Sequence, residues 1–205
     1  MSVITISRQF GAAGKTFGRQ LADILGYYYV DEDIIERAVV EAYVSPEGRK
    51  IIESEPGDKL RKFISKLNPF GTSLMELPLS DKERYIDGFK YVELLNLIIP
   101  KIAKDGNAVI VGRGGQYILH TFAETYHLLL IANEEDRINF IEENYRVSRT
   151  KAVQMIKRMD KRRANLFSYF RRKDYDDPAI YNLVLNMSLV SIEKAQDLVY
   201  KLING

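Results

Sequence analysis

Residues 3–26 read VITISRQFGAAGKTFGRQLADILG and join two different hydrophobic patterns. The first, at 3–7, is a short apolar run that predicts a buried strand. The second predicts an amphipathic helix over 14–25, because four apolar residues share one stripe before Gly26 ends the pattern: Phe17, Leu21, Ile24 and Leu25. We therefore expect a strand, a glycine-containing turn and a helix whose apolar stripe packs on a sheet.

The turn, QFGAAGKT at 9–16, matches the phosphate-binding P-loop pattern (Gly, four residues, Gly-Lys-Ser/Thr) except that Gln9 replaces the first glycine. We expect Gln9 to adopt the backbone shape that glycine would give. In a P-loop, the backbone N–H groups of the loop and the N-terminus of the following helix bind phosphate oxygens. The lysine of the motif reaches the β- and γ-phosphates, and the Ser or Thr hydroxyl binds Mg²⁺. The alternative is a plain strand-to-helix turn, but the position between a strand and an amphipathic helix favours the P-loop. The expected ATP site is Gly11, Ala12, Ala13, Gly14, Lys15 and Thr16, with Thr16 as the Mg²⁺ ligand.

Length and composition predict one compact domain, 1–205, with 46% hydrophobic and 28% charged residues. The absence of cysteine excludes disulfides, thiolate metal sites and a cysteine nucleophile, and the only histidines are His120 and His127. We see neither a signal peptide nor an apolar run long enough to cross a bilayer. We therefore expect a cytoplasmic protein without a membrane partner.

Short β-rich runs alternate with longer helical patterns, which predicts an α/β fold with a five-stranded parallel sheet flanked by helices. The strands are expected at 3–7, 27–30, 108–112, 126–132 and 181–185. The helices are expected at 14–25, after Asp31, near 83–104, and at 134–145, 149–172 and 190–203. Between the second and third strands we expect a helical insertion, 32–90, with a polar stretch at 45–82.

Polar residues that directly follow strands are candidates for ligand binding, because open α/β sheets bind ligands at the carboxyl ends of their strands. Asp31 follows the second strand, either as a ligand-binding residue or as the N-cap of the next helix, and the two roles are compatible. Arg113 follows the third strand among glycines, with no acid nearby in the sequence, which favours anion binding.

Positive charge is concentrated at 146–173, where eleven Lys and Arg residues meet one acid, Asp160. The segment carries +10 in a chain of net charge +2, so the remainder carries −8. Arg158 and Arg162 share a helix face and Arg163 lies beside it, so the segment 146–175 can act as a lid whose arginines close over phosphates. A solvated basic face is the alternative. Nucleic-acid binding is disfavoured, because the acidic remainder would repel a long polyanion.

These elements, in this order, resemble the cytidylate-kinase-like group of P-loop nucleoside monophosphate kinases. The resemblance lies in ITISRQFGAAGKTFGRQLADILG (4–26), YVDEDII (29–35), VIVGRGGQYIL (109–119), DKRRANLFSYF (160–170) and YDDPAIYNLVLN (175–186). It implies a P-loop NTPase fold that holds MgATP, and an acceptor nucleotide held by the insertion 32–90. The residues to which it assigns roles are Lys15, Arg158, Arg162 and Arg163 in catalysis, and Asp31 and Arg113 in acceptor binding. Asp160, within the lid, is a further candidate for substrate binding.

Two positions depart from the family pattern. Gly112-Arg113-Gly114 stands where cytidylate kinases have Gly-Arg-Asp, so an aspartate that helps to recognise the acceptor is missing. Gln9 replaces the first P-loop glycine, whereas Lys15 is kept, which indicates retained chemistry. We expect ATP-dependent phosphoryl transfer to CMP or dCMP, with small nucleotides as the partners. The alternatives are another small-molecule acceptor, or a nucleotide sensor with little turnover. No sequence feature indicates an oligomeric state.

Overall fold

The computed structural model describes residues 2–53 and 86–205, in which five parallel strands form one sheet of order β2-β3-β1-β4-β5. The strands are β1 (Val3–Arg8), β2 (Tyr28–Val30), β3 (Ala108–Val111), β4 (Thr125–Ile131) and β5 (Leu183–Asn186). In the central register, Val3 of β1 lies between Ala108 and Thr125. The expected parallel sheet is confirmed, and each strand lies within two residues of its predicted range.

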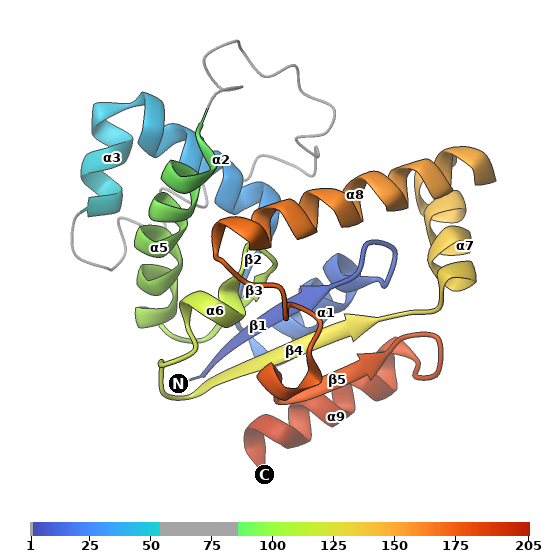
Figure 1. Ribbon diagram of the computed structural model, residues 1–205. Coiled ribbons are helices and arrows are strands. Elements are labelled where there is room, and N and C mark those ends of the chain that lie inside the picture. Colours follow the sequence, from blue (N-terminus) through green and yellow to red (C-terminus); the bar gives the residue numbers. More distant parts are fainter. Residues whose placement is uncertain (1, 54–85) are drawn as a thin grey trace.

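Helices cover both faces of the sheet (Figure 1). On one face, α1 (Gly14–Leu25) and α9 (Ile192–Asn204) pack against Ile4, Ile6 and the other strand residues that point that way. The opposite face, with Val3 and Ile110, is covered by three further helices: α2 (Glu32–Val44), α5 (Gly88–Lys104) and α6 (Gly115–Ile118). Successive strand side chains point to opposite faces, and β3, which is buried on both, is apolar along its whole length.

Helix α1 forms as predicted, but its buried stripe differs by one residue. Phe17 and Leu21 are fully buried and Leu25 is partly buried, whereas Ile24 is 55% exposed, so its predicted place in the core is wrong. Gly18 takes part in the buried face instead. A Cβ atom on Gly18 would lie 2.8 Å from Val111 Cγ2, so α1 packs against β3 more closely than a larger residue would permit.

The insertion begins with helices in the part that the structure describes. The polar stretch expected at 45–82 starts with an unpredicted helix, α3 (Pro46–Glu53), where proline at the first position suits helix initiation. Residues 54–85 lie outside the described residues, so most of that polar stretch is not described. The long helix expected from residue 83 is described as α5, which Asp87 caps by accepting hydrogen bonds from backbone N–H groups.

Two helices form a hairpin above the carboxyl end of the sheet: α7 (Glu134–Tyr145) and α8 (Arg149–Tyr169). They share a small apolar core that includes Ile138 and Met155. The predicted range of α7 is confirmed, and α8 ends three residues before its predicted end. A short 3₁₀ helix, η1 (Pro178–Ile180), then leads into β5. No described helix combines the length and apolarity needed to cross a membrane.

Candidate active site

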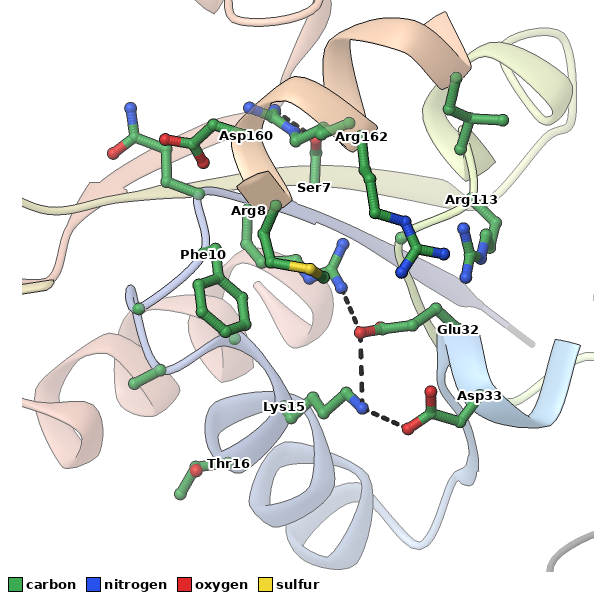
Figure 2. A pocket seen from close by; sticks show the side chains of 18 of the residues that line it. Ser7, Arg8, Phe10, Lys15, Thr16, Glu32, Asp33, Arg113, Asp160 and Arg162 are labelled. Atoms are coloured by element: carbon green, nitrogen blue, oxygen red, sulfur yellow. Dashed lines mark hydrogen bonds and ion pairs between the residues drawn. The ribbon is translucent and has the colours of Figure 1, made fainter. Parts of the chain in front are cut away.

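A cavity of about 430 Å³ lies at the carboxyl end of the sheet. Its walls include the P-loop, the first turn of α2, the loop after β3 and α8, which the sequence analysis assigned to ligand binding (Figure 2). The end of α7, which it did not, also lines the cavity with Phe140, Asn144 and Tyr145. The predicted site residues that line it are Gly11, Ala13, Gly14, Lys15, Thr16, Arg113, Asp160, Arg162 and Arg163. Three others do not line it: Ala12, Asp31 and Arg158.

The P-loop turns through left-handed backbone at Gly11 (φ 90°) and Ala13 (φ 56°), whereas Gln9 has no positive φ. Gln9 therefore does not use the left-handed backbone that a glycine would permit. Its backbone N–H continues the strand by donating to the Leu130 carbonyl at 3.0 Å, and its side-chain Oε1 accepts from the Ala132 N–H at 3.1 Å. Gln9 thus fixes the start of the loop to the end of β4.

Arg137, on α7, holds the P-loop from the other side. It is 8% exposed, and its Nε donates to the Phe10 carbonyl at 2.7 Å. Its Nη2 lies 2.7 Å from Asp160 Oδ2, so one guanidinium joins the P-loop to α8. A Cβ atom on Gly11 would meet the Arg137 carbonyl at 2.9 Å, so glycine is required there for packing as well as for φ. Asp160 was predicted to bind substrate, but in the structure it contacts Arg137.

The first turn of α2 brings carboxylates onto the P-loop cation. Lys15 Nζ lies 2.5 Å from Asp33 Oδ2 and 3.4 Å from Glu32 Oε1, and Arg8 Nη2 lies 2.6 Å from the same Glu32 oxygen. Burial opposes ionisation of Glu32, but Arg8, Lys15 and Arg113 outweigh it and lower the pKa of Glu32 to about 2. Burial likewise opposes the charge of Lys15, but Glu32 and Asp33 raise its pKa. Glu32 and Lys15 therefore both stay charged at neutral pH.

Arg8 is a cavity residue that the sequence analysis missed. Its side chain passes beside two glycines: a Cβ atom on Gly14 would lie 2.6 Å from Arg8 Cγ, and one on Gly112 would lie 2.7 Å from Arg8 Nη1. Both glycines therefore leave room for this guanidinium. Its position directly after the strand, next to the P-loop, was the only sequence signal that could have identified it.

Asp31 caps α2, one of the two roles predicted for it. Its Oδ1 accepts from the N–H groups of Asp33 and Ile34, both at 3.1 Å, and the residue is 6% exposed. Burial raises its pKa. The acids of α2 that line the cavity are Glu32, Asp33 and Glu36 instead.

Arg113 lines the cavity from a strained turn. Its φ is 54°, between Gly112 at 84° and Gly114 at 74°, so three consecutive residues are left-handed. The guanidinium forms an ion pair with Glu36 of α2, 77 residues earlier in the chain. Its Nε is buried and has no hydrogen-bond partner among the described residues, which leaves a donor for a bound anion.

The missing aspartate of the Gly-Arg-Asp pattern has a structural explanation. A Cβ atom on Gly114 would lie 2.8 Å from Cε2 and Cζ of Phe170, directly after α8. The ring therefore occupies the space that an aspartate side chain would enter. Because φ is also positive, Gly114 is doubly constrained.

The three arginines predicted to act from α8 lie in different environments. Arg163 Nη2 contacts Asp176 Oδ1 at 2.6 Å and Ser7 Oγ at 3.0 Å, and its guanidinium lies over the rings of Phe167 and Tyr175. Arg162 is exposed, lines the cavity and has no carboxylate partner among the described residues. The structure thus brings Arg162 and Arg163 to the cavity and leaves Arg158 outside it.

The donor set suits a magnesium-bound polyphosphate. P-loop backbone, the N-terminus of α1 and Lys15 line one side of the cavity, with Thr16 beside them. In the described ranges, no cluster of three His, Asp or Glu residues is arranged to hold a metal by itself. Such an ion would therefore depend on the Thr16 hydroxyl and on phosphate oxygens, as is typical of Mg²⁺.

Residues 3–189 match the cytidylate kinase-like family, and the chain belongs to that family. A solved structure of an uncharacterized protein from Eubacterium ventriosum is similar with a TM-score of 0.67 at 16% identity, over 100% of this chain and 99% of that chain. A shikimate kinase from Acinetobacter baumannii, solved with shikimate, has a TM-score of 0.50 at 13% identity, over 100% and 93% of the two chains. No curated protein matches. The P-loop kinase fold is confirmed, and family and fold together support a nucleotide-binding phosphotransferase.

Proposed function

We propose that the protein transfers the γ-phosphoryl group of MgATP to a nucleoside monophosphate, with CMP or dCMP as the acceptor that the family favours. One observation carries this proposal: P-loop Lys15, Arg113 after β3 and Arg162, which has no ion pair among the described residues, line the same cavity from three different elements. Its volume of about 430 Å³ is in the range of small-molecule sites, which favours small nucleotides over nucleic acid as partners.

Phosphoryl transfer requires in-line positioning and charge neutralisation rather than a protein nucleophile. The Thr16 hydroxyl would help to hold Mg²⁺, which would neutralise part of the phosphate charge. The P-loop N–H groups and Lys15 would hold the donor, while Arg113 would orient the acceptor phosphate. Arg162 can approach the transferring group from α8, and Leu166 and Phe167 of the same helix line the cavity and limit the entry of water.

A second candidate is a kinase for a small molecule that accepts the phosphoryl group on a hydroxyl. Glu32, Asp33 and Glu36 line the cavity beside the P-loop. A hydroxyl acceptor must lose a proton, and a nearby carboxylate can receive it, whereas an acceptor phosphate needs no base. Phe170 beside Gly114 also favours an acceptor unlike that of cytidylate kinases.

ADP release from MgATP, measured with CMP, dCMP, AMP, GMP and shikimate as acceptors, separates the candidates. Highest turnover with CMP or dCMP supports the proposal, and turnover with shikimate alone supports a hydroxyl acceptor. ATP binding without turnover on any acceptor would contradict both and indicate a sensor. Lys15→Ala, measured in parallel, controls for contaminating kinases.

A further inference from the structure

Lys15 is held by acids of another element. Figure 2 shows a chain of contacts from Arg8 to Glu32, from Glu32 to Lys15 and from Lys15 to Asp33. The Lys15–Asp33 contact, at 2.5 Å, is the shortest of the three, and the two side chains are 38% and 21% exposed. Both acids belong to the first turn of α2, on the acceptor side of the cavity.

The two acids differ in their other partners. Glu32 is 13% exposed and shares one carboxylate oxygen between Arg8 and Lys15, so it keeps a cation if Lys15 moves. Asp33 has no other cation partner among the described residues. Its backbone N–H is bound to Asp31, which fixes the position of Asp33 within the capping turn. Asp33 therefore loses its one ion pair among the described residues when Lys15 moves, although its charge also acts on Arg113 at longer range.

A donor polyphosphate requires the same ammonium group. Phosphate oxygens in the P-loop would compete with Asp33 Oδ2 for Lys15 Nζ, because both are anionic acceptors for one cation. Any free energy that the Lys15–Asp33 pair contributes before binding is lost when Lys15 turns to the donor. The pair must therefore weaken donor binding by the same amount.

We propose that Asp33 is a positioning residue for Lys15: it holds the ammonium group over the P-loop and releases it to the donor polyphosphate, and thereby sets the affinity for the donor. This inference rests on the proposed function only in taking the donor to be a nucleoside polyphosphate. An acid in the first turn of a helix can also act merely by stabilising that helix, and the test must separate the two roles.

The test measures the Kd of MgADP by calorimetry for the wild type, Asp33→Asn and Asp23→Asn. Asp33→Asn removes the competing charge and keeps the side-chain size, and we expect about three- to ten-fold tighter binding, as for the loss of a partly exposed ion pair. Asp23 is exposed on α1 and does not line the cavity, so Asp23→Asn makes the same change in net charge and should leave the Kd within two-fold.

The decisive comparison repeats Asp33→Asn in a Lys15→Met background. If Asp33 acts through Lys15, the tightening disappears there, whereas a purely structural effect persists. Three results would overturn the inference. The first is unchanged or weaker binding in Asp33→Asn, and the second is equal tightening in both backgrounds. The third is no detectable MgADP binding in either the wild type or Asp33→Asn. A circular-dichroism melt confirms that each variant is folded.

This measurement needs no turnover and is therefore independent of the acceptor panel. If the Kd shifts as expected but no acceptor is phosphorylated, the proposed function fails and the inference stands. If an acceptor is phosphorylated but the Kd does not shift, only the inference fails.

Discussion

The Arg137 guanidinium donates from Nε to the Phe10 carbonyl and from Nη2 to Asp160, and so fixes the P-loop between α7 and α8. The residue is almost fully buried although it lies on a helix with five acids in its sequence. The loop that would hold the donor phosphates is thus shaped partly by a side chain more than 120 residues away.

Arg137→Ala should destabilise the protein by about 1–3 kcal/mol, because it leaves the Phe10 carbonyl without its side-chain donor and the Asp160 carboxylate, 40% exposed, without its ion-pair partner. Urea unfolding measures the loss, and the MgADP affinity should fall with it. Arg149→Ala is the matched control: its pair with Glu135 is 52% and 62% exposed, and we expect a change below about 1 kcal/mol. Equal effects of the two substitutions would contradict the anchoring role.

Lys15→Ala should remove phosphoryl transfer while leaving the fold intact, because the side chain lines the cavity and is not part of the core. Loss of this charge in the transition state should lower kcat by about 10²–10³, or about 3–4 kcal/mol. Turnover is measured as ADP release and folding by circular dichroism. Unchanged turnover would end the assignment of the P-loop.

Arg162 and Arg158, both exposed on α8, should differ in effect. Arg162→Ala should lower kcat at least ten-fold, because Arg162 lines the cavity and no carboxylate in the described part of the chain neutralises it. Arg158→Ala should lower kcat less than two-fold. Steady-state kinetics with saturating MgATP distinguish the two variants. The opposite ranking would mean that the part of the α8 surface with Arg158, and not the part with Arg162, faces the substrates.

Gly114→Asp should not convert the protein into a better cytidylate kinase. The new Cβ atom would lie 2.8 Å from the Phe170 ring at a residue with φ 74°, so we expect about 2–3 kcal/mol of destabilisation in urea unfolding. Adding Phe170→Ala should relieve the clash without restoring full stability. A single variant as stable as the wild type, with improved CMP turnover, would refute this account of the missing aspartate.

Stability should fall as the pH drops from 6.5 to 4, in part because of His127. Its Nδ1 lies 2.7 Å from Thr5 Oγ1 between two strands, and burial, with a smaller effect from His120, lowers its pKa to about 4. Between pH 6.5 and 4 the unfolded chain binds a proton that the folded chain does not, which favours unfolding. Thermal melts at pH 7.5 and 5 should show a smaller difference for His127→Gln than for the wild type. An equal difference would assign the pH effect to other groups.

The sheet and most helices were predictable because their signals are local. Apolar runs marked the strands, and helical spacing placed α1 and α7. The site was predictable where a motif, a strand end or a charge cluster marked it, as at Lys15, Arg113 and Arg162. Glu36 and Arg137 escaped because their functional contacts join segments far apart in sequence, and Ile24 was misassigned because spacing alone does not show where a helix face leaves the sheet.

Gln9 bears on any attempt to engineer this chain by consensus. Substitution toward the common residue of a motif usually stabilises a protein, and the P-loop pattern would put glycine at this position. Here that change would delete the amide that caps the end of β4 and would loosen a backbone that needs no left-handed residue. The sequence would match the P-loop pattern better, but the loop would lose its attachment to β4. At this residue a closer match to the pattern therefore means a less well anchored loop.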